Sequence, residues 1–139
     1  MSLQPLLDAP WVVQLHAFSA MAAFFLGVFQ LAAPKGTLPH KSLGVVWLAL
    51  MVVVAGSSIF IRPALFPGLA FTQWFGWIHI FTVVTIFGIV GGVAYLARGG
   101  ATLKRHSRPF IGVFIGGLVI AGGFAFFPGR IMHEVVFGG

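Results

Sequence analysis

The stretch WFGWIHIFTVVTIFGIVGGVAYLA, residues 74–97, decides the fold. It contains no Lys, Arg, Asp or Glu, and its apolar residues run on without the alternation of a half-buried strand. A helix needs about 20 mostly apolar residues to cross a bilayer, whereas a lipid-facing barrel strand is about half as long. This stretch therefore predicts a transmembrane helix.

Three other stretches share this character, and prolines and glycines fall between them. They are Trp11–Ala33, Leu43–Ile61 and Pro109–Phe127. We expect helices over about residues 11–33, 41–62, 74–97 and 107–127, which form a single transmembrane domain covering residues 1–139. The predicted fold class is an all-α membrane protein, with four transmembrane helices in an up-down-up-down bundle, in which two hairpins form a pseudo-repeat.

Composition excludes a soluble domain. Of the 139 residues, 59% are hydrophobic and only 7% are charged, whereas soluble domains carry about 25% charged residues. The chain has no Cys, which excludes disulfides, thiolate metal sites and haem attached through Cys-x-x-Cys-His. Its first ten residues contain no Lys or Arg, so the basic region of a secretory signal is missing and we expect the first helix to be retained.

Basic residues predict the orientation in the membrane. Lys35 and Lys41 follow the first helix, and a second basic group follows the third: Arg98, Lys104, Arg105 and Arg108. Arg62 and Arg130 lie on the opposite side. Because basic loops stay in the cytoplasm, we expect a bacterial inner-membrane protein with both termini in the periplasm. The net charge of +6 then reflects topology and contact with the bilayer, not nucleic acid.

Four histidines form two pairs at matched depths. His16 and His79 lie five residues inside the first and third helices, and His40 and His106 precede the second and fourth. Alternate helices of an up-down-up-down bundle are diagonally opposite. Two imidazoles presented from opposite sides suit the axial positions of a haem iron. The pattern predicts an outer haem b at His16 and His79 and an inner one at His40 and His106, about 25 Å apart at 1.5 Å per residue.

Other residues have two interpretations. Arg62 and Arg130 would pair with haem propionates or contact lipid headgroups. An intramembrane histidine is functional by default. If no haem is bound, His16 and His79 would instead hydrogen-bond neighbouring helices. The glycines of the third and fourth helices, among them Gly112-x-x-x-Gly116, favour close helix packing or leave room for a macrocycle. His133, after the fourth helix, is a candidate for lining a quinone or proton site.

A short internal repeat agrees with the pairing. The first helix reads His16-Ala-Phe-Ser and the third reads His79-Ile-Phe-Thr. Two hairpins inserted in the same direction are related by an axis along the membrane normal. Such an axis would superimpose His16 on His79 and His40 on His106.

Three segments carry a resemblance to a known family: Lys35–Gly44 (KGTLPHKSLG), Ile78-His79-Ile80 and Pro128–Met132 (PGRIM). They resemble a family of small bacterial predicted membrane proteins of unknown function, which implies four helices and no established activity. The chain differs from that family in the proline of Ser107-Arg108-Pro109. The histidine arrangement is also similar to that of diheme transmembrane b-type cytochromes, including quinol-linked and ferric-reductase-like proteins. That likeness implies haem b and electron transfer, with a quinone as one candidate partner.

The sequence therefore favours a membrane b-type cytochrome, a haem-dependent oxidoreductase that carries one or two haems and exchanges electrons with a quinone or a redox protein. The alternative is a haem-free small subunit of a larger respiratory or photosynthetic complex, or a homo-oligomer, because sixteen Phe give it ample apolar contact surface. A transporter is the third interpretation.

Overall fold

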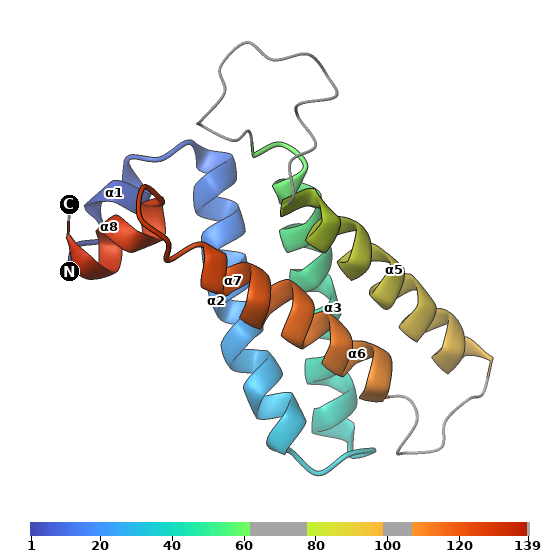
Figure 1. Cartoon of the computed structure of the whole chain (residues 1–139). Coiled ribbons are helices and arrows are strands. Elements are labelled where there is room, and N and C mark those ends of the chain that lie inside the picture. Colours follow the sequence, from blue (N-terminus) through green and yellow to red (C-terminus); the bar gives the residue numbers. More distant parts are fainter. Residues whose placement is uncertain (62–77, 99–106, 139) are drawn as a thin grey trace.

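The computed structural model describes residues 1–61, 78–98 and 107–138. Every regular element within these ranges is helical (Figure 1). The elements are α1 (Gln4–Leu7), α2 (Trp11–Ala32), α3 (Leu38–Ser58), α5 (Ile78–Ala97), α6 (Ser107–Val113), the π-helical segment η1 (Phe114–Ile120), α7 (Ala121–Phe124) and α8 (Ile131–Phe137). The all-helical class predicted from the sequence is confirmed.

Three helices are long and apolar enough to cross a membrane: α2, α3 and the His79–Ala97 part of α5. The fourth apolar segment, Arg108–Phe124, is shorter. It is formed by α6, η1 and α7, which follow one another without a break. The prediction of a membrane protein built from apolar helices is confirmed for these three spans, and the fourth is shorter than expected.

The second helix begins earlier than predicted. The sequence predicts a start at residue 41, but α3 begins at Leu38, so His40 lies in its first turn rather than before it. The Thr37 hydroxyl accepts the backbone N–H of His40 at 3.3 Å, which caps the helix. Pro39 does not break the helix, because a first-turn residue needs no N–H partner. At its other end α3 stops at Ser58, short of the predicted residue 62, which lies outside the described ranges.

The other predicted boundaries move by a few residues. α2 ends at Ala32, and Ala33 is extended because the residue before a proline avoids the helical conformation; the next residue is Pro34. The fourth segment ends at Phe124 rather than residue 127, and Pro128 and Gly129, with a φ of +79°, complete the turn that follows. Residues 74–77 of the predicted third helix lie outside the described ranges.

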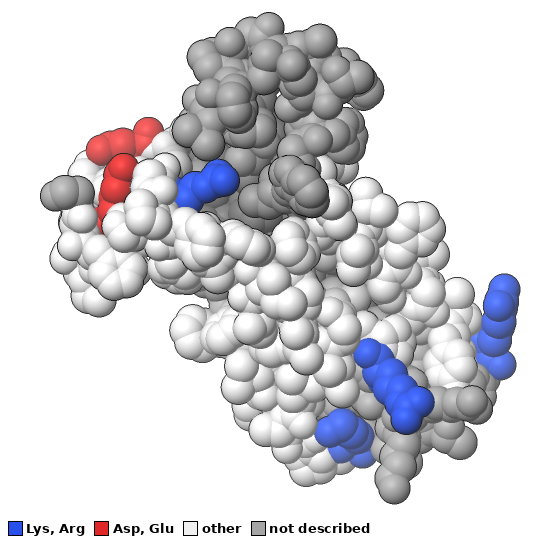
Figure 2. All heavy atoms as spheres, viewed as in Figure 1, with Lys and Arg blue, Asp and Glu red and all other residues white. Residues whose placement is uncertain are grey.

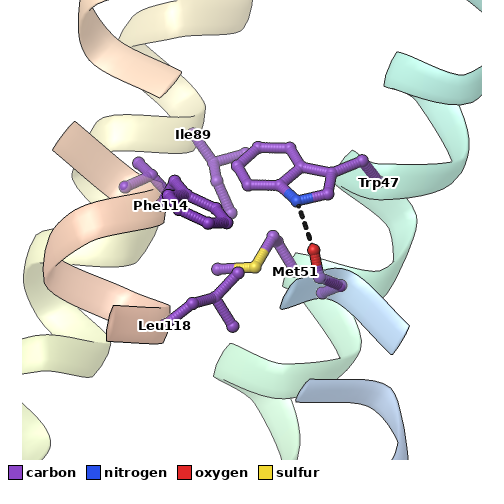
Figure 3. Packing of buried hydrophobic residues seen from close by; sticks show 7 residues of the cluster. Trp47, Met51, Ile89, Phe114 and Leu118 are labelled. Atoms are coloured by element: carbon purple, nitrogen blue, oxygen red, sulfur yellow. Dashed lines mark hydrogen bonds between the residues drawn. The ribbon is translucent and has the colours of Figure 1, made fainter. Parts of the chain in front are cut away.

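The apolar helices pack around one core. α2 packs most extensively on α3, α3 contacts α5, α5 contacts α6 and η1, and η1 returns to α2. Met51 is fully buried at the centre, near Ile89, Phe114 and Leu118 (Figure 3). The Trp47 indole N–H donates to the Ala23 carbonyl at 2.9 Å and so joins α3 to α2 inside this core.

Only some of the predicted packing glycines pack. A Cβ atom on Gly88 would meet the Val113 side chain, and one on Gly117 would lie 2.7 Å from Thr85 Oγ1. By contrast, Cβ atoms on Gly112 and Gly116 would meet nothing within 4 Å among the described residues. Close packing is therefore confirmed for Gly88 and Gly117, whereas Gly112 and Gly116 make no such contact with the described residues.

Charges gather at the two ends of the molecule (Figure 2). One end, which we call the basic end, carries the described basic residues next to the α2–α3 and α5–α6 connections: Lys35, Lys41, Arg98 and Arg108. At the other end, the terminal end, the chain termini lie side by side (Figure 1). There α1 packs on α8, and the Ser2 N–H donates to the Val135 carbonyl at 3.1 Å.

Candidate functional sites at the two ends of the helices

A cavity of about 530 Å³ opens at the basic end. Its walls come from α2, the α2–α3 loop, α3, α5, α6 and η1. All four apolar helical segments therefore contribute to it, which places it between them. Binding sites for organic cofactors typically occupy about 300–1,000 Å³, so this basic-end cavity is of cofactor size.

Most of the wall of the basic-end cavity is apolar. Trp47, Phe110 and Phe114 line it together with aliphatic side chains. The Trp47 and Phe110 rings meet edge to face, with centroids 6.3 Å apart and planes at 88°, a favoured aromatic geometry. Because the indole also donates to Ala23, the ring is held on two sides. Gly27 and Gly44 line the cavity as well, so no side chain fills it from those positions.

One side of the basic-end cavity is polar: Gln30, Lys35, His40 and Lys41. The Gln30 side-chain amide, on α2, donates to the His40 carbonyl at 2.8 Å, and Thr37 accepts the His40 N–H. Both backbone polar groups of His40 are thus fixed by side chains. Lys35 and Lys41 are exposed, and their ammonium groups give this end of the cavity a positive field.

A second group of polar residues lies in the half of the molecule nearer the terminal end. His16 Nδ1, on α2, is 3.0 Å from the Val54 carbonyl oxygen and 3.1 Å from Ser57 Oγ, both on α3. Ser58 Oγ is 2.8 Å from Thr82 Oγ1 on α5. Since Ser58 Oγ also donates to the Ala55 carbonyl at 2.7 Å, Thr82 is the donor between the two hydroxyls.

His79 belongs to the same group. It is buried, with 5% of its surface exposed, and lies three residues before Thr82 on α5, so both occupy one face of that helix. We call His16, Ser57, Ser58, His79 and Thr82 the polar layer. Through α3 it links the two helices that carry the predicted outer ligands.

The Ser58–Thr82 hydrogen bond offers a test of how much the polar layer stabilises the protein. In a double-mutant cycle of Ser58→Ala and Thr82→Val, we expect a coupling free energy of about 0.6 kcal/mol, and at most about 1.7 kcal/mol, as is usual between transmembrane helices. Unfolding in mixed detergent micelles would measure it. Ser42→Ala is the control, because its hydroxyl donates only to Pro39 on the same helix. A coupling of zero would contradict the contact.

The structure places the sequence-predicted residues in different settings. His40 lines the basic-end cavity, whereas His16 and His79 line neither this cavity nor the smaller groove between α3 and α5. Arg130 precedes α8 at the terminal end. His106 and Arg62 lie outside the described residues.

His133 lies on α8, outside the apolar helices. It is half-buried, and its Nδ1 is 2.9 Å from the Phe126 carbonyl oxygen. Among the described residues, no three His, Cys, Asp or Glu side chains lie together as ligands for a metal ion. A haem iron held by two histidines needs only two such side chains, so it does not require a group of three.

Sequence reasoning missed Thr37, which carries a readable signal, since Thr followed by Pro39 at the start of an apolar run is typical of a capped helix N-terminus. Gln30 and Ser57 are polar groups inside apolar spans, so the sequence predicts that they hydrogen-bond between helices, and the structure confirms this. The sequence does not reveal their partners, because these lie on another helix and depend on how α2 and α3 align.

Comparison with known protein families, with curated proteins and with solved structures found no match to this chain. The resemblance to the small bacterial membrane-protein family, and the likeness to diheme cytochromes, therefore stay predictions. A function must be inferred from the residues of the basic-end cavity and the polar layer.

Proposed function

We propose that this protein is a membrane b-type cytochrome that transfers electrons within the bilayer, with a haem in the basic-end cavity. The observation that carries the proposal is the cavity itself. It has cofactor size, lies between four apolar helical segments, and has His40 in its wall with two lysines beside it.

The residues of the basic-end cavity fit a haem. A haem b has a flat apolar macrocycle and two carboxylates. Trp47, Phe110 and Phe114 offer apolar surface to the ring, and Lys35 and Lys41 offer charge to the propionates. His40 supplies an imidazole on a backbone that Thr37 and Gln30 hold in place. Pre-organised ligands of this kind cost little entropy on binding.

Two further parts of the proposal, a second ligand at the basic end and a second haem, rest mainly on the sequence. His106 is the proposed second ligand at the basic end, and His16 and His79 are proposed to hold a second haem nearer the terminal end. The latter pair is supported by packing: α2 and α5 each contact α3 and η1, which agrees with an up-down-up-down bundle in which they are diagonal. Arg62 and Arg130 remain the proposed propionate partners there.

Each group of residues would have a defined task. Haem iron supplies one-electron redox chemistry when it is bound by two imidazoles. The aromatic wall of the basic-end cavity would keep water away, and burial together with hydrogen bonds to the ligands would set the reduction potential. The basic end is proposed to face the cytoplasm of a bacterial inner membrane, with a quinone or a redox protein as electron partner.

An absorption spectrum tests the proposal. Protein purified in detergent from haem-replete cells should show a low-spin b-type spectrum that sharpens on reduction with dithionite, at two haems per chain. His79→Ala should lower the ratio to one. A colourless protein from such cells would overturn the proposal.

One observation favours a second candidate, the haem-free subunit of a larger membrane complex. Gly112, Gly116, Gly122 and Gly123 lie on the fourth apolar segment, and Cβ atoms there would meet nothing among the described residues. Small uncovered residues allow another transmembrane helix to approach. Co-purification of a fixed partner with colourless protein would favour this function over the cytochrome.

A further inference from the structure

His16 is held against α3 by one of its two ring nitrogens. Nδ1 lies 3.0 Å from the Val54 carbonyl oxygen and 3.1 Å from Ser57 Oγ. These partners belong to the last two turns of α3, where helix carbonyls carry partial negative charge. The ring is therefore attached to α3 at Nδ1, although its backbone belongs to α2.

Both partners act as acceptors. A carbonyl oxygen has no proton to give. Ser57 has one hydroxyl proton, and its Oγ lies 2.6 Å from the Val53 carbonyl oxygen, a separation at which two oxygens need a proton between them. That proton is therefore used within α3, and Ser57 Oγ can only accept from His16.

The geometry points to a single tautomer of His16, with the proton on Nδ1 and the lone pair on Nε2. We infer that Nε2 is the ligand atom of His16, and that the Val54 carbonyl and the Ser57 hydroxyl are positioning groups that fix it. That Nε2 binds haem iron rests on the proposed function. A hydrogen bond from one ring nitrogen to a carbonyl sets the tautomer of metal-binding histidines and raises their basicity.

This assignment gives α3 a part in the site nearer the terminal end, although it contributes no predicted ligand there. Among the described residues, His133 has the same Nδ1-to-carbonyl bond, to Phe126 at 2.9 Å, but lies on α8, outside the apolar helices. His133 is thus a matched control, with the same ring chemistry in a place where no haem is proposed.

The first test reads the tautomer directly. In protein labelled with ¹⁵N-histidine and freed of haem, the His16 resonances, assigned by their loss in His16→Asn, should show a protonated Nδ1 and an unprotonated Nε2. A protonated Nε2 would overturn the inference. This measurement does not depend on haem, so a colourless protein with the Nδ1–H tautomer would overturn the proposed function and leave the tautomer assignment standing.

The second test separates a ligand from a packing residue. The amide of Asn can occupy the place of Nδ1 and donate to Val54, but Asn has no atom at the place of Nε2. Compared in the haem-free state, His16→Asn should therefore unfold at the same temperature as the unmodified protein, because loss of a bound ligand would itself lower that temperature. Purified from haem-replete cells, His16→Asn should lose one haem per chain, while His133→Asn loses none. A His16→Asn protein that keeps both haems would overturn the ligand assignment without touching the basic-end haem.

The third test concerns Ser57. Ser57→Ala removes one of the two acceptors of Nδ1, which lowers the basicity of the ring, so the midpoint potential of the haem that is lost in His16→Asn should rise. Ser57→Thr keeps the hydroxyl and should restore the original potential. An unchanged potential in Ser57→Ala would show that Ser57 plays no positioning role.

Discussion

His40→Ala is expected to remove the haem from the basic-end cavity, so that the haem-to-protein ratio falls by one haem per chain. The ring at position 40 is the proposed ligand, and alanine offers no atom that binds iron. The backbone should stay in place, because Thr37 accepts the N–H of residue 40 and Gln30 donates to its carbonyl, and alanine keeps both groups. The reduced-minus-oxidised absorption spectrum of the purified variant would measure the loss.

His133→Ala provides the comparison, since it removes an imidazole from α8 without touching the cavity. Its haem content should equal that of the unmodified protein. Addition of free imidazole to His40→Ala should restore part of the lost absorbance by filling the space of the ring. A His40→Ala protein with its full haem content would show that the basic-end cavity uses other ligands.

The apolar helices were predictable because their signal is compositional. Inside a bilayer no water reaches the backbone, so a long and continuously apolar run such as residues 79–97 satisfies its N–H and C=O groups by intrahelical bonds. The signal is weaker at helix ends. A proline next to an apolar run suggests the end of a helix, yet Pro39 lies in the capped first turn of α3, which accepts proline.

The sequence indicates which types of residue form the candidate sites, but it does not indicate which of these residues contact one another. Histidine in an apolar run stands out, because it is costly in lipid and seldom without a role. That His16 meets Ser57, and that Gln30 meets the His40 carbonyl, depends on the rotation of α2 against α3. The apolar residues surround these helices on all sides, so no polar stripe in the sequence reveals which face turns inward.

The fourth apolar segment shows the same limit in another form. Several of its glycines favour close helix packing, but the sequence does not tell which of them meets α5, and among the described residues a Cβ on Gly117 is the one that would meet Thr85. The π-helical segment Phe114–Ile120 winds more widely than an α-helix and so shifts which residues face α5. No characteristic residue composition marks a π-helical segment, so the sequence does not predict where it lies.

Gly88→Ala is expected to destabilise the protein by roughly 1–3 kcal/mol, the usual cost of an extra methyl group in a close-packed core. A Cβ atom at this position would collide with the side chain of Val113, which is 2% exposed. Valine is β-branched and has little rotamer freedom in a helix, so α5 and α6 would have to move apart. Unfolding in mixed detergent micelles would show the loss as a lower midpoint.

Gly91→Ala makes the comparison within the same helix. A Cβ atom on Gly91 would meet nothing within 4 Å among the described residues, and alanine is favoured over glycine inside a helix by roughly 0.5–1 kcal/mol. This variant should therefore be as stable as the unmodified protein or slightly more so. Equal destabilisation by both substitutions would mean that α5 does not turn Gly88 toward α6, and the assignment of its packing face would be wrong. Phe110 lies on the same face of α6 as Val113, lines the basic-end cavity and packs on Gly92. If Gly88 does face α6, that result therefore also supports the position of Phe110 in the wall proposed to hold the haem.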